Sequence, residues 1–212
     1  MAPRVAGRAE AGVVGAPLQP PPLKGAYTVG TVSLMIYLYI VHSFKLDAAS
    51  VVLTVGLLGI CLFVRPLRIS PSLMWYGAFL GWALVTLPLS NYKAEAWDSW
   101  IIAFKLWLIV FLAYNAIKTP GQLRLIMLTW LVVFALYPVR GTLLNFLFGY
   151  STFGRYAWNF TFANFNDLSA YTLIPLGFAV DRLRSAEAKW VKLGALGGLI
   201  LLPFITLLTQ SR

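Results

Sequence analysis

Charged side chains are scarce in this chain: Asp, Glu, Lys and Arg make up 11% of its 212 residues, whereas 59% of the residues are hydrophobic. A soluble domain carries about 25% charged residues and about 45–50% apolar ones. A chain of this composition has too few polar residues to cover a surface exposed to water. The shortage excludes an ordinary soluble domain and indicates a membrane protein.

Cysteine, histidine and acidic residues are also rare. Cys61 is the only cysteine, His42 is the only histidine, and Asp and Glu total 7. A single cysteine forms no intramolecular disulfide, and because Cys61 lies in an apolar run we interpret it as a buried structural thiol. The sequence has no His-Glu-x-x-His pattern, no carboxylate cluster and no Gly-rich phosphate loop. We therefore expect no metal ion and no cofactor, and few candidates for a general base.

Long apolar runs are abundant. A helix needs about 20 apolar residues to cross about 30 Å of hydrocarbon, and these runs are continuous, whereas the strands of a membrane barrel alternate. Residues 1–26 are rich in Pro, Ala and Gly without hydrophobic periodicity, and we interpret them as a disordered cytoplasmic tail. We predict an all-α polytopic membrane protein whose seven spans lie at about 27–41, 50–64, 72–89, 100–116, 123–144, 168–180 and 191–209.

These spans divide the 17 Lys and Arg residues unequally between the two sides of the membrane. The side of the N-terminus receives 11, namely Arg4, Arg8, Lys24, Arg65, Arg68, Lys118, Arg124, Arg182, Arg184, Lys189 and Lys192. The other side receives 6, namely Lys45, Lys93, Lys105, Arg140, Arg155 and Arg212. Cytoplasmic loops carry the excess of Lys and Arg, so the N-terminus is predicted to be cytoplasmic. The net charge of +10 therefore reports topology, and we expect no nucleic-acid partner.

Four cations on the predicted outer side are candidate binding residues, since the topology rule disfavours Lys and Arg there and burial costs about 2.5–3.5 kcal/mol. Lys105 lies inside the fourth predicted span, where it either snorkels to the surface or faces an internal cavity. Arg140 follows Pro138, where we expect the helix to break. Arg155 lies among aromatic residues, and we interpret it as solvated or stacked on them. Arg212 follows the last apolar run, either as an interfacial anchor or as a ligand of the substrate.

Polar residues flank the last two spans. Asn164, Asn166 and Asp167 precede the sixth span and are typical of a helix N-terminus, while residues 209–212 follow the seventh span. The charged turn at 181–192 separates the two spans, so both polar stretches should lie on the same outer side. Arginine side chains together with polar groups at such a surface favour a phosphate or diphosphate ligand.

These motifs resemble those of the bacterial O-antigen ligase and O-antigen polymerase family. Residues 164–167 (Asn-Phe-Asn-Asp) are similar to the family's Asn-Pro-Asn-Asp/Glu motif, with Phe165 in the place of proline. Residues 209–212 (Thr-Gln-Ser-Arg) are similar to its Thr/Ser-x-Ser-Arg-Gly motif. Residues 96–100 (Ala-Trp-Asp-Ser-Trp) and 139–141 (Val-Arg-Gly) look like the branch that accompanies exosortase systems. The resemblance covers about residues 30–212.

The resemblance implies a metal-independent transferase with a glycosyltransferase-C-like helical fold in the bacterial inner membrane. Such an enzyme moves a glycan from a polyprenyl diphosphate carrier to a hydroxyl group of an acceptor glycolipid or protein on the outer face. It further implies that the diphosphate is bound by outward cations, with residues 164–167 in a positioning role. The candidates for diphosphate binding are Arg140, Arg212, Lys105 and Arg155.

Family members continue past the Ser-Arg pair with a glycine, further spans and an outer loop that bears a catalytic histidine. This chain is similar only to the N-terminal part of such a protein, and we assign no catalytic residue in it. Two alternatives stay open: an inactive membrane fragment, and a transporter or flippase module for an anionic lipid-linked substrate. Inverted internal repeats are typical of many transporters, and we detect none.

Overall fold

The computed structural model describes residues 23, 25–43, 46–64, 66–152, 154–158, 164–185 and 187–209. Within these residues the structure is helical apart from turns, loops and one isolated bridge between Thr152 and Arg155, which confirms the all-α fold class. The helices are α1 (Val29–His42), α2 (Leu46–Phe63), α3 (Pro71–Thr86), η1 (Leu87–Leu89), α4 (Lys93–Ala116), α5 (Pro120–Phe134), η2 (Ala135–Val139), α6 (Arg140–Leu147), α7 (Phe165–Arg184) and α8 (Lys189–Thr209).

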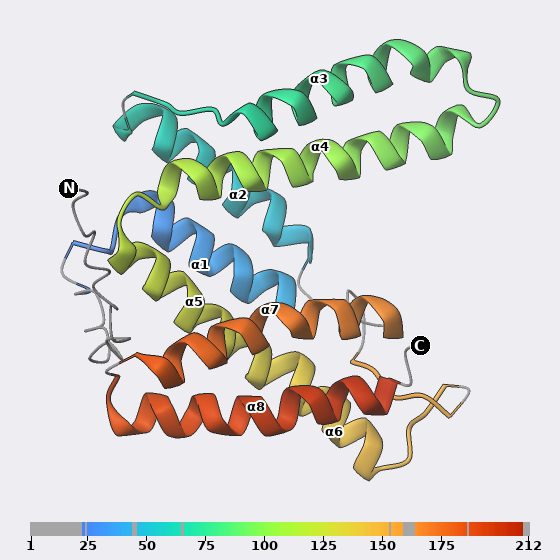
Figure 1. Ribbon diagram of the computed structural model, residues 1–212. Helices are drawn as coiled ribbons and strands as arrows, with labels where there is room; N and C mark the ends of the chain where they lie inside the picture. Colours follow the sequence, from blue (N-terminus) through green and yellow to red (C-terminus); the bar gives the residue numbers. More distant parts are fainter. Residues whose placement is uncertain are drawn as a thin grey trace, which may run out of the picture.

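The helices run back and forth between the two ends of the molecule (Figure 1). α1 lies in the middle and packs against α2, α4 and α5, while α7 packs against α8 and α5. The α3–α4 hairpin extends away from the bundle (Figure 1), and α3 packs chiefly against α4 and η1. In this arrangement the α6–α7 loop, the start of α7 and the end of α8 lie at one end of the molecule.

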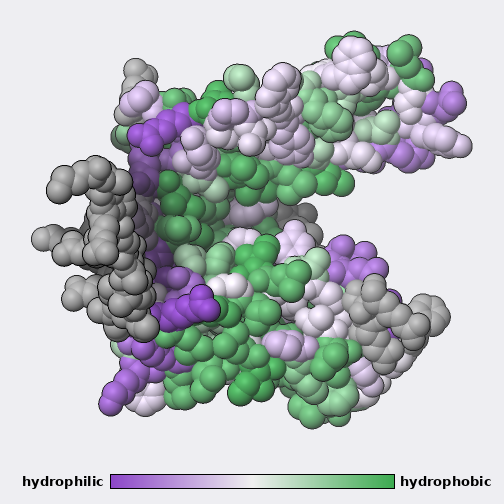
Figure 2. Space-filling view, in the orientation of Figure 1, coloured by the Kyte–Doolittle hydropathy of each residue, from purple (hydrophilic) through white to green (hydrophobic). Residues whose placement is uncertain are grey.

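Four helical segments among the described residues are long and apolar enough to cross a membrane: Pro71–Leu89, Lys93–Ala116, Pro120–Leu147 and Lys189–Thr209. Val29–His42 and Ala48–Phe63 are apolar but shorter. Their outer faces carry exposed large apolar side chains, and Figure 2 shows hydrophobic residues over much of the visible surface. Such a surface suits lipid, so the structure supports a membrane protein, while the full set of seven spans stays a prediction.

Local sequence signals explain where several helices begin. Thr28 and Thr119 each form a capping box at the start of α1 and α5, and Ser70 caps α3 through a hydrogen bond from the Leu73 backbone N–H. Pro71 provides the first residue of α3, where its missing N–H needs no partner. α4 and α7 extend beyond the predicted apolar spans, because their ends carry polar and charged residues that an apolar pattern omits, whereas α1 begins at Val29 instead of residue 27.

The expected helix break at Pro138 is wrong. The chain stays helical through this point, with a π-helical segment, η2, between α5 and α6, and Arg140 is the first residue of α6. Proline lacks an N–H and its ring clashes with the carbonyl group four residues earlier. The wider π-helical turn accommodates the ring, and such turns are common at functional sites. Arg140 therefore stands on a continuous helix.

Small residues allow close packing around α1. A Cβ atom added to Gly30 would lie 2.9 Å from Cβ of Ala116, and one added to Gly56 would lie 2.9 Å from Cβ of Ser33. These distances leave no room for a side chain at either glycine. α1 therefore packs closely against α4 at its own Gly30, and against α2 at Gly56 of that helix. Close approach at small residues is a usual basis of helix association in membranes.

Two sequence expectations concern the surface. Cys61, expected to be buried, is exposed on α2. The physical reason is that an apolar run in a membrane protein faces lipid as readily as protein, so apolar neighbours do not predict burial. Most of the expected tail of residues 1–26 lies outside the described residues, but Ala26 is described and is buried, with its carbonyl oxygen accepting a hydrogen bond from the Thr31 hydroxyl group.

Candidate functional site

The start of α7 and the end of α8 lie at the same end of the molecule (Figure 1), and Arg155 of the preceding loop contacts both. Its Nε donates a hydrogen bond to the backbone oxygen of Thr209 (2.6 Å), and its Nη2 donates one to Oδ1 of Asn166 (3.1 Å). Its guanidinium carbon lies 4.3 Å from the centre of the Phe165 ring, which is a cation–π contact. Of the two interpretations of Arg155, solvated or stacked, the structure shows stacking on Phe165, and the side chain also connects the two polar motifs.

The loop that carries Arg155 is fixed by α6 and α8. Nδ2 of Asn145 donates to the backbone oxygen of Ala157 (2.7 Å), and the backbone N–H of Tyr156 donates to the oxygen of Leu208 (3.1 Å). A Cβ atom added to Gly141 would lie only 1.7 Å from the Trp158 ring, so the glycine makes the space that this indole fills. Arg155 therefore has a defined place although it lies outside any helix.

Hydroxyl groups connect α7 to α8, and one of them belongs to Thr209, the residue whose carbonyl oxygen Arg155 binds. Oγ of Ser169 and Oγ1 of Thr209 are 2.5 Å apart, and the Oγ1 atoms of Thr172 and Thr206 are 2.8 Å apart. Interhelical hydrogen bonds of this kind contribute about 0.6 kcal/mol each in a membrane protein. Their directional geometry fixes how far α7 and α8 slide past each other. The same register sets the distance between Asn166 and the Thr209 carbonyl, both of which hold Arg155.

A cavity of ≈ 520 Å³ lies beside Arg155 and Phe165. Arg155 contributes a cation to its wall, and polar groups of the preceding loop and of α6 contribute hydroxyl and amide groups. The complete lining is Asn145, Tyr150, Ser151, Thr152, Arg155, Ala157, Trp158 and Phe165. Because guanidinium, hydroxyl and amide groups all donate hydrogen bonds, this cavity is suited to an anionic, oxygen-rich ligand.

Neither Arg140 nor Lys105, the other predicted binding residues that the structure describes, lines this cavity. Arg140 is exposed at the start of α6, and its neighbour Gly141 packs against Trp158 in the cavity wall. Lys105 is exposed on α4 and is not part of this cavity wall. Arg212 lies outside the described residues.

The residues of the predicted motif at the start of α7 have different structural roles. Asn164 is the N-cap of α7, as expected, and its side chain accepts a hydrogen bond from the Asn166 backbone N–H (3.0 Å). Asn166 holds Arg155, and Asp167 is exposed in the first helical turn. An acidic residue there suits the positive end of a helix. The motif therefore both starts the helix and positions the arginine.

An ionic cluster at the opposite end was missed by sequence analysis. Glu187 accepts hydrogen bonds from Arg124 of α5 (2.6 Å to Nη2) and from Arg182 of α7 (2.6 Å to Nη1), and Asp181 also pairs with Arg182. Arg182 and Glu187 are only 5% and 7% exposed. By sequence alone, Arg124 and Arg182 contribute only to the charge count that predicts topology. The available signal was Glu187, an acidic residue within a basic turn.

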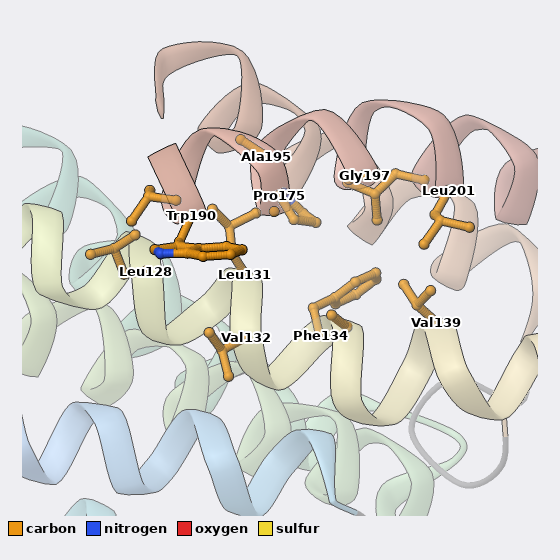
Figure 3. A pocket seen from close by; sticks show the side chains of 15 residues that line it. Leu128, Leu131, Val132, Phe134, Val139, Pro175, Trp190, Ala195, Gly197 and Leu201 are labelled. Carbon is orange, nitrogen blue, oxygen red and sulfur yellow. The ribbon is translucent and has the colours of Figure 1, made fainter. Parts of the chain in front are cut away.

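A second cavity is apolar and lies between the α5–η2 segment and α8 (Figure 3). It has a volume of ≈ 450 Å³, and in Figure 3 the Trp190 indole lies toward one end and Val139, the residue before Arg140, toward the other. Glycines of α8 form part of the wall, so side chains from α5 and η2 meet little bulk across the cavity. These glycines are Gly194, Gly197 and Gly198.

Comparison of the chain with protein-family models, with curated proteins and with solved structures finds no match. Within the described part of the chain, no three His, Cys, Asp or Glu side chains are grouped so that they hold a metal ion.

Proposed function

We propose that this chain is the substrate-binding, N-terminal part of a bacterial membrane glycan ligase or polymerase. In this proposal it spans the inner membrane seven times, with a glycosyltransferase-C-like arrangement and a cytoplasmic N-terminus. It holds the diphosphate of a polyprenyl diphosphate-linked glycan at the outer face. The observation that supports this function is Arg155, bound to Asn166 and Thr209 at the wall of a polar cavity.

The chemistry of the cavity favours a diphosphate over a neutral ligand. A guanidinium group binds phosphate oxygens with two parallel hydrogen bonds, and a fixed guanidinium loses less freedom when it does so. Arg155 is fixed through Nε and Nη2. The volume of ≈ 520 Å³ falls in the range of about 300–1,000 Å³ that is usual for small-molecule sites. Arg140 does not line this cavity, but it precedes Gly141, which packs against Trp158 of the cavity wall.

The apolar cavity of Figure 3 suits the polyprenyl chain of such a carrier. It ends at Val139, directly before Arg140, so a lipid in it would have its polar head near the outer cations. Its lining is nearly all aliphatic or aromatic, so an isoprenoid chain in it makes van der Waals contacts without burying polar groups. The two cavities together match an amphiphile with an anionic head.

In the proposed reaction an acceptor hydroxyl group attacks the anomeric carbon of the glycan. The bond between that carbon and the diphosphate oxygen breaks, and the diphosphate leaves with additional negative charge. Arg155 and Arg140 would stabilise that charge as it develops. The hydroxyl proton goes to a general base, which we do not assign to any residue of this chain.

Binding of a fluorescent polyprenyl diphosphate to the purified chain in nanodiscs tests the proposal. Hydrogen bonds to a charged group contribute about 1.5–3 kcal/mol, so Arg155→Ala should raise the Kd by about 10- to 100-fold. Arg155→Lys should recover part of the affinity, because lysine keeps the positive charge but lacks the two parallel N–H donors of the guanidinium group. Lys93→Ala, which removes an exposed cation at the start of α4, is the matched control and should leave the Kd unchanged.

Wild-type affinity in the Arg140→Ala/Arg155→Ala double variant would contradict the assignment. Flux of an anionic solute through proteoliposomes, with no diphosphate binding, would favour the transporter alternative. Absence of both would favour an inactive fragment. Thermal unfolding of each variant shows whether the loss of affinity comes from the missing guanidinium or from an unfolded loop.

A further inference from the structure

The end of the molecule opposite Arg155 carries a third cavity, lined by two cations. It lies between the segment before α3 and the end of α4, and its volume is ≈ 390 Å³. Figure 2 shows hydrophilic residues along this end, where the α2–α3 connection and the α4–α5 turn lie in Figure 1. The lining residues are Arg68, Val110, Ala113, Tyr114, Ile117 and Lys118.

Arg68 is held at this cavity by a buried asparagine. Asn115, which is 1% exposed, accepts a hydrogen bond from the Arg68 backbone N–H (2.8 Å) and donates one to the Arg68 backbone oxygen (3.0 Å). Its amide also donates to the oxygen of Phe111, one turn earlier in α4. This two-point attachment fixes Arg68 against the end of α4, only a few residues from Lys118.

The two cations of this cavity differ from their neighbours at the same end. Arg124 and Arg182 form ion pairs with Glu187, whereas none of the ion pairs found among the described residues includes Arg68 or Lys118. Both of these side chains are exposed. Two like charges beside one cavity repel each other, so an anion between them would be favoured.

The remaining wall of the cavity is apolar or aromatic. Val110 and Tyr114 are 49% and 42% exposed on the surface of α4, a helix long and apolar enough to lie in a membrane. A soluble anion gains nothing from these side chains. A lipid with a phosphate head gains from both parts, because its head meets the cations and its acyl chain covers the apolar wall.

We propose that this cavity binds an anionic phospholipid of the surrounding membrane, with its phosphate between Arg68 and Lys118 and an acyl chain along Val110 and Tyr114. Basic pockets between membrane helices on the cytoplasmic side are suited to anionic head groups. The bound lipid would connect the segment before α3 to the end of α4, and would thereby anchor the protruding hairpin. This binding depends on neither Arg155 nor the proposed glycan chemistry.

Native mass spectrometry of the purified chain, titrated with phosphatidylglycerol or phosphatidylcholine, tests the site. Each cation near a membrane surface contributes about 1 kcal/mol to binding an anionic lipid, so Arg68→Ala/Lys118→Ala should weaken phosphatidylglycerol binding by about thirtyfold. The matched control, Lys189→Ala/Lys192→Ala, removes two cations from the same end at the start of α8 and should change the affinity less than twofold. Asn115→Ala keeps both cations but releases Arg68, and should weaken binding as well.

Three results would overturn the proposal. One is equal affinity of the wild-type chain for the two lipids. Another is an equal loss in the control variant, which would show general attraction to a basic surface rather than a site. The third is displacement of phosphatidylglycerol by millimolar inorganic phosphate, which would identify a site for a soluble anion. Because both cations are exposed, their replacement should leave the thermal unfolding temperature unchanged, and this measurement accompanies each titration.

Discussion

Arg155 is positioned by acceptors on two different helices. Its Nε donates to the backbone oxygen of Thr209, the last residue described in α8. Asn166 supplies a second acceptor from the first turn of α7. The same guanidinium therefore satisfies the backbone and forms part of the cavity wall, so a change in α8 at this end should alter ligand binding.

At the residue scale, Gly141→Ala should displace the loop that holds Arg155. The new methyl group would lie 1.7 Å from the Trp158 ring, so the indole has to leave its place. Overpacking of this kind costs about 1–3 kcal/mol. We expect a lower unfolding temperature and faster trypsin cleavage at Arg155, because the loop becomes accessible.

Gly177→Ala is the control for this experiment. Gly177 lies within α7, and a Cβ atom there has nothing within 4 Å. Alanine favours a helix over glycine by about 0.5–1 kcal/mol, so this variant should be at least as stable as the wild type. Cleavage at Arg155 that is equally slow in both variants would show that Trp158 does not fix the loop.

At the scale of elements, the α3–α4 hairpin is held together by a row of aromatic rings. Trp97, Trp100, Phe104, Trp107 and Phe111 stack in sequence along α4, with ring centres 5.5, 5.1, 6.3 and 5.6 Å apart. Their spacing of three and four residues places them on one helix face. Two of the indoles reach α3, where the Nε1 atoms of Trp100 and Trp107 donate to the oxygens of Leu80 (2.9 Å) and Leu73 (2.8 Å).

Trp107→Phe should weaken this hairpin without removing an aromatic ring from the row. The substitution deletes the donor to the Leu73 oxygen, and an interhelical hydrogen bond contributes about 0.6 kcal/mol in a membrane protein. Trp75→Phe is the control, because Trp75 is 73% exposed on α3. Unfolding in increasing dodecyl sulfate should be shifted to lower concentration by Trp107→Phe and unchanged by Trp75→Phe. Equal curves for the two variants would mean that the indole hydrogen bond contributes no stability.

Apolar patterns predicted the helical elements better than their ends. The sixth span was predicted at 168–180, yet α7 runs from Phe165 to Arg184. Its first turn is the polar Asn166–Asp167 pair with Asn164 as cap, and its last turn contains Arg182, which Glu187 and Asp181 neutralise. An apolar run stops where such residues begin, although the helix continues. Hydropathy alone does not report partners that come from other elements.

The candidate site was predictable in its residue types and not in its contacts. The two polar motifs at the ends of α7 and α8 were expected on one side, and the contact of Arg155 with Asn166 and Thr209 brings their described residues together. The sequence alone indicates a solvated or stacked loop residue at Arg155, because nothing in its neighbours indicates the Thr209 carbonyl group that it binds. The Gly141–Trp158 contact likewise joins residues whose proximity only the fold creates.

At the scale of the whole molecule, the ion pairs found among the described residues all lie at one end. That end has Arg124, Arg182 and Glu187 in a largely buried cluster that joins α5, α7 and the α7–α8 turn, and it also carries the exposed Arg68 and Lys118. The other end has Arg155 at an open polar cavity. Counting Lys and Arg gives an orientation but does not separate paired charges from those that meet a ligand. The orientation itself decides which end faces the cytoplasm, and therefore on which side of the membrane each cavity lies.

Labelling of single cysteines in bacterial cells tests the predicted orientation. In a Cys61→Ser background, Asn91→Cys places a thiol in the α3–α4 turn and Ala188→Cys places one in the α7–α8 turn, and both positions are exposed. A membrane-impermeant maleimide should label the Asn91→Cys variant in intact spheroplasts, because positive residues hold the α7–α8 turn in the cytoplasm. The Ala188→Cys variant should react only after the membrane is opened. The reverse pattern would place Arg155 on the cytoplasmic side and exclude transfer of a glycan at the outer face. Labelling of both variants in intact spheroplasts would contradict an odd number of spans between the two turns.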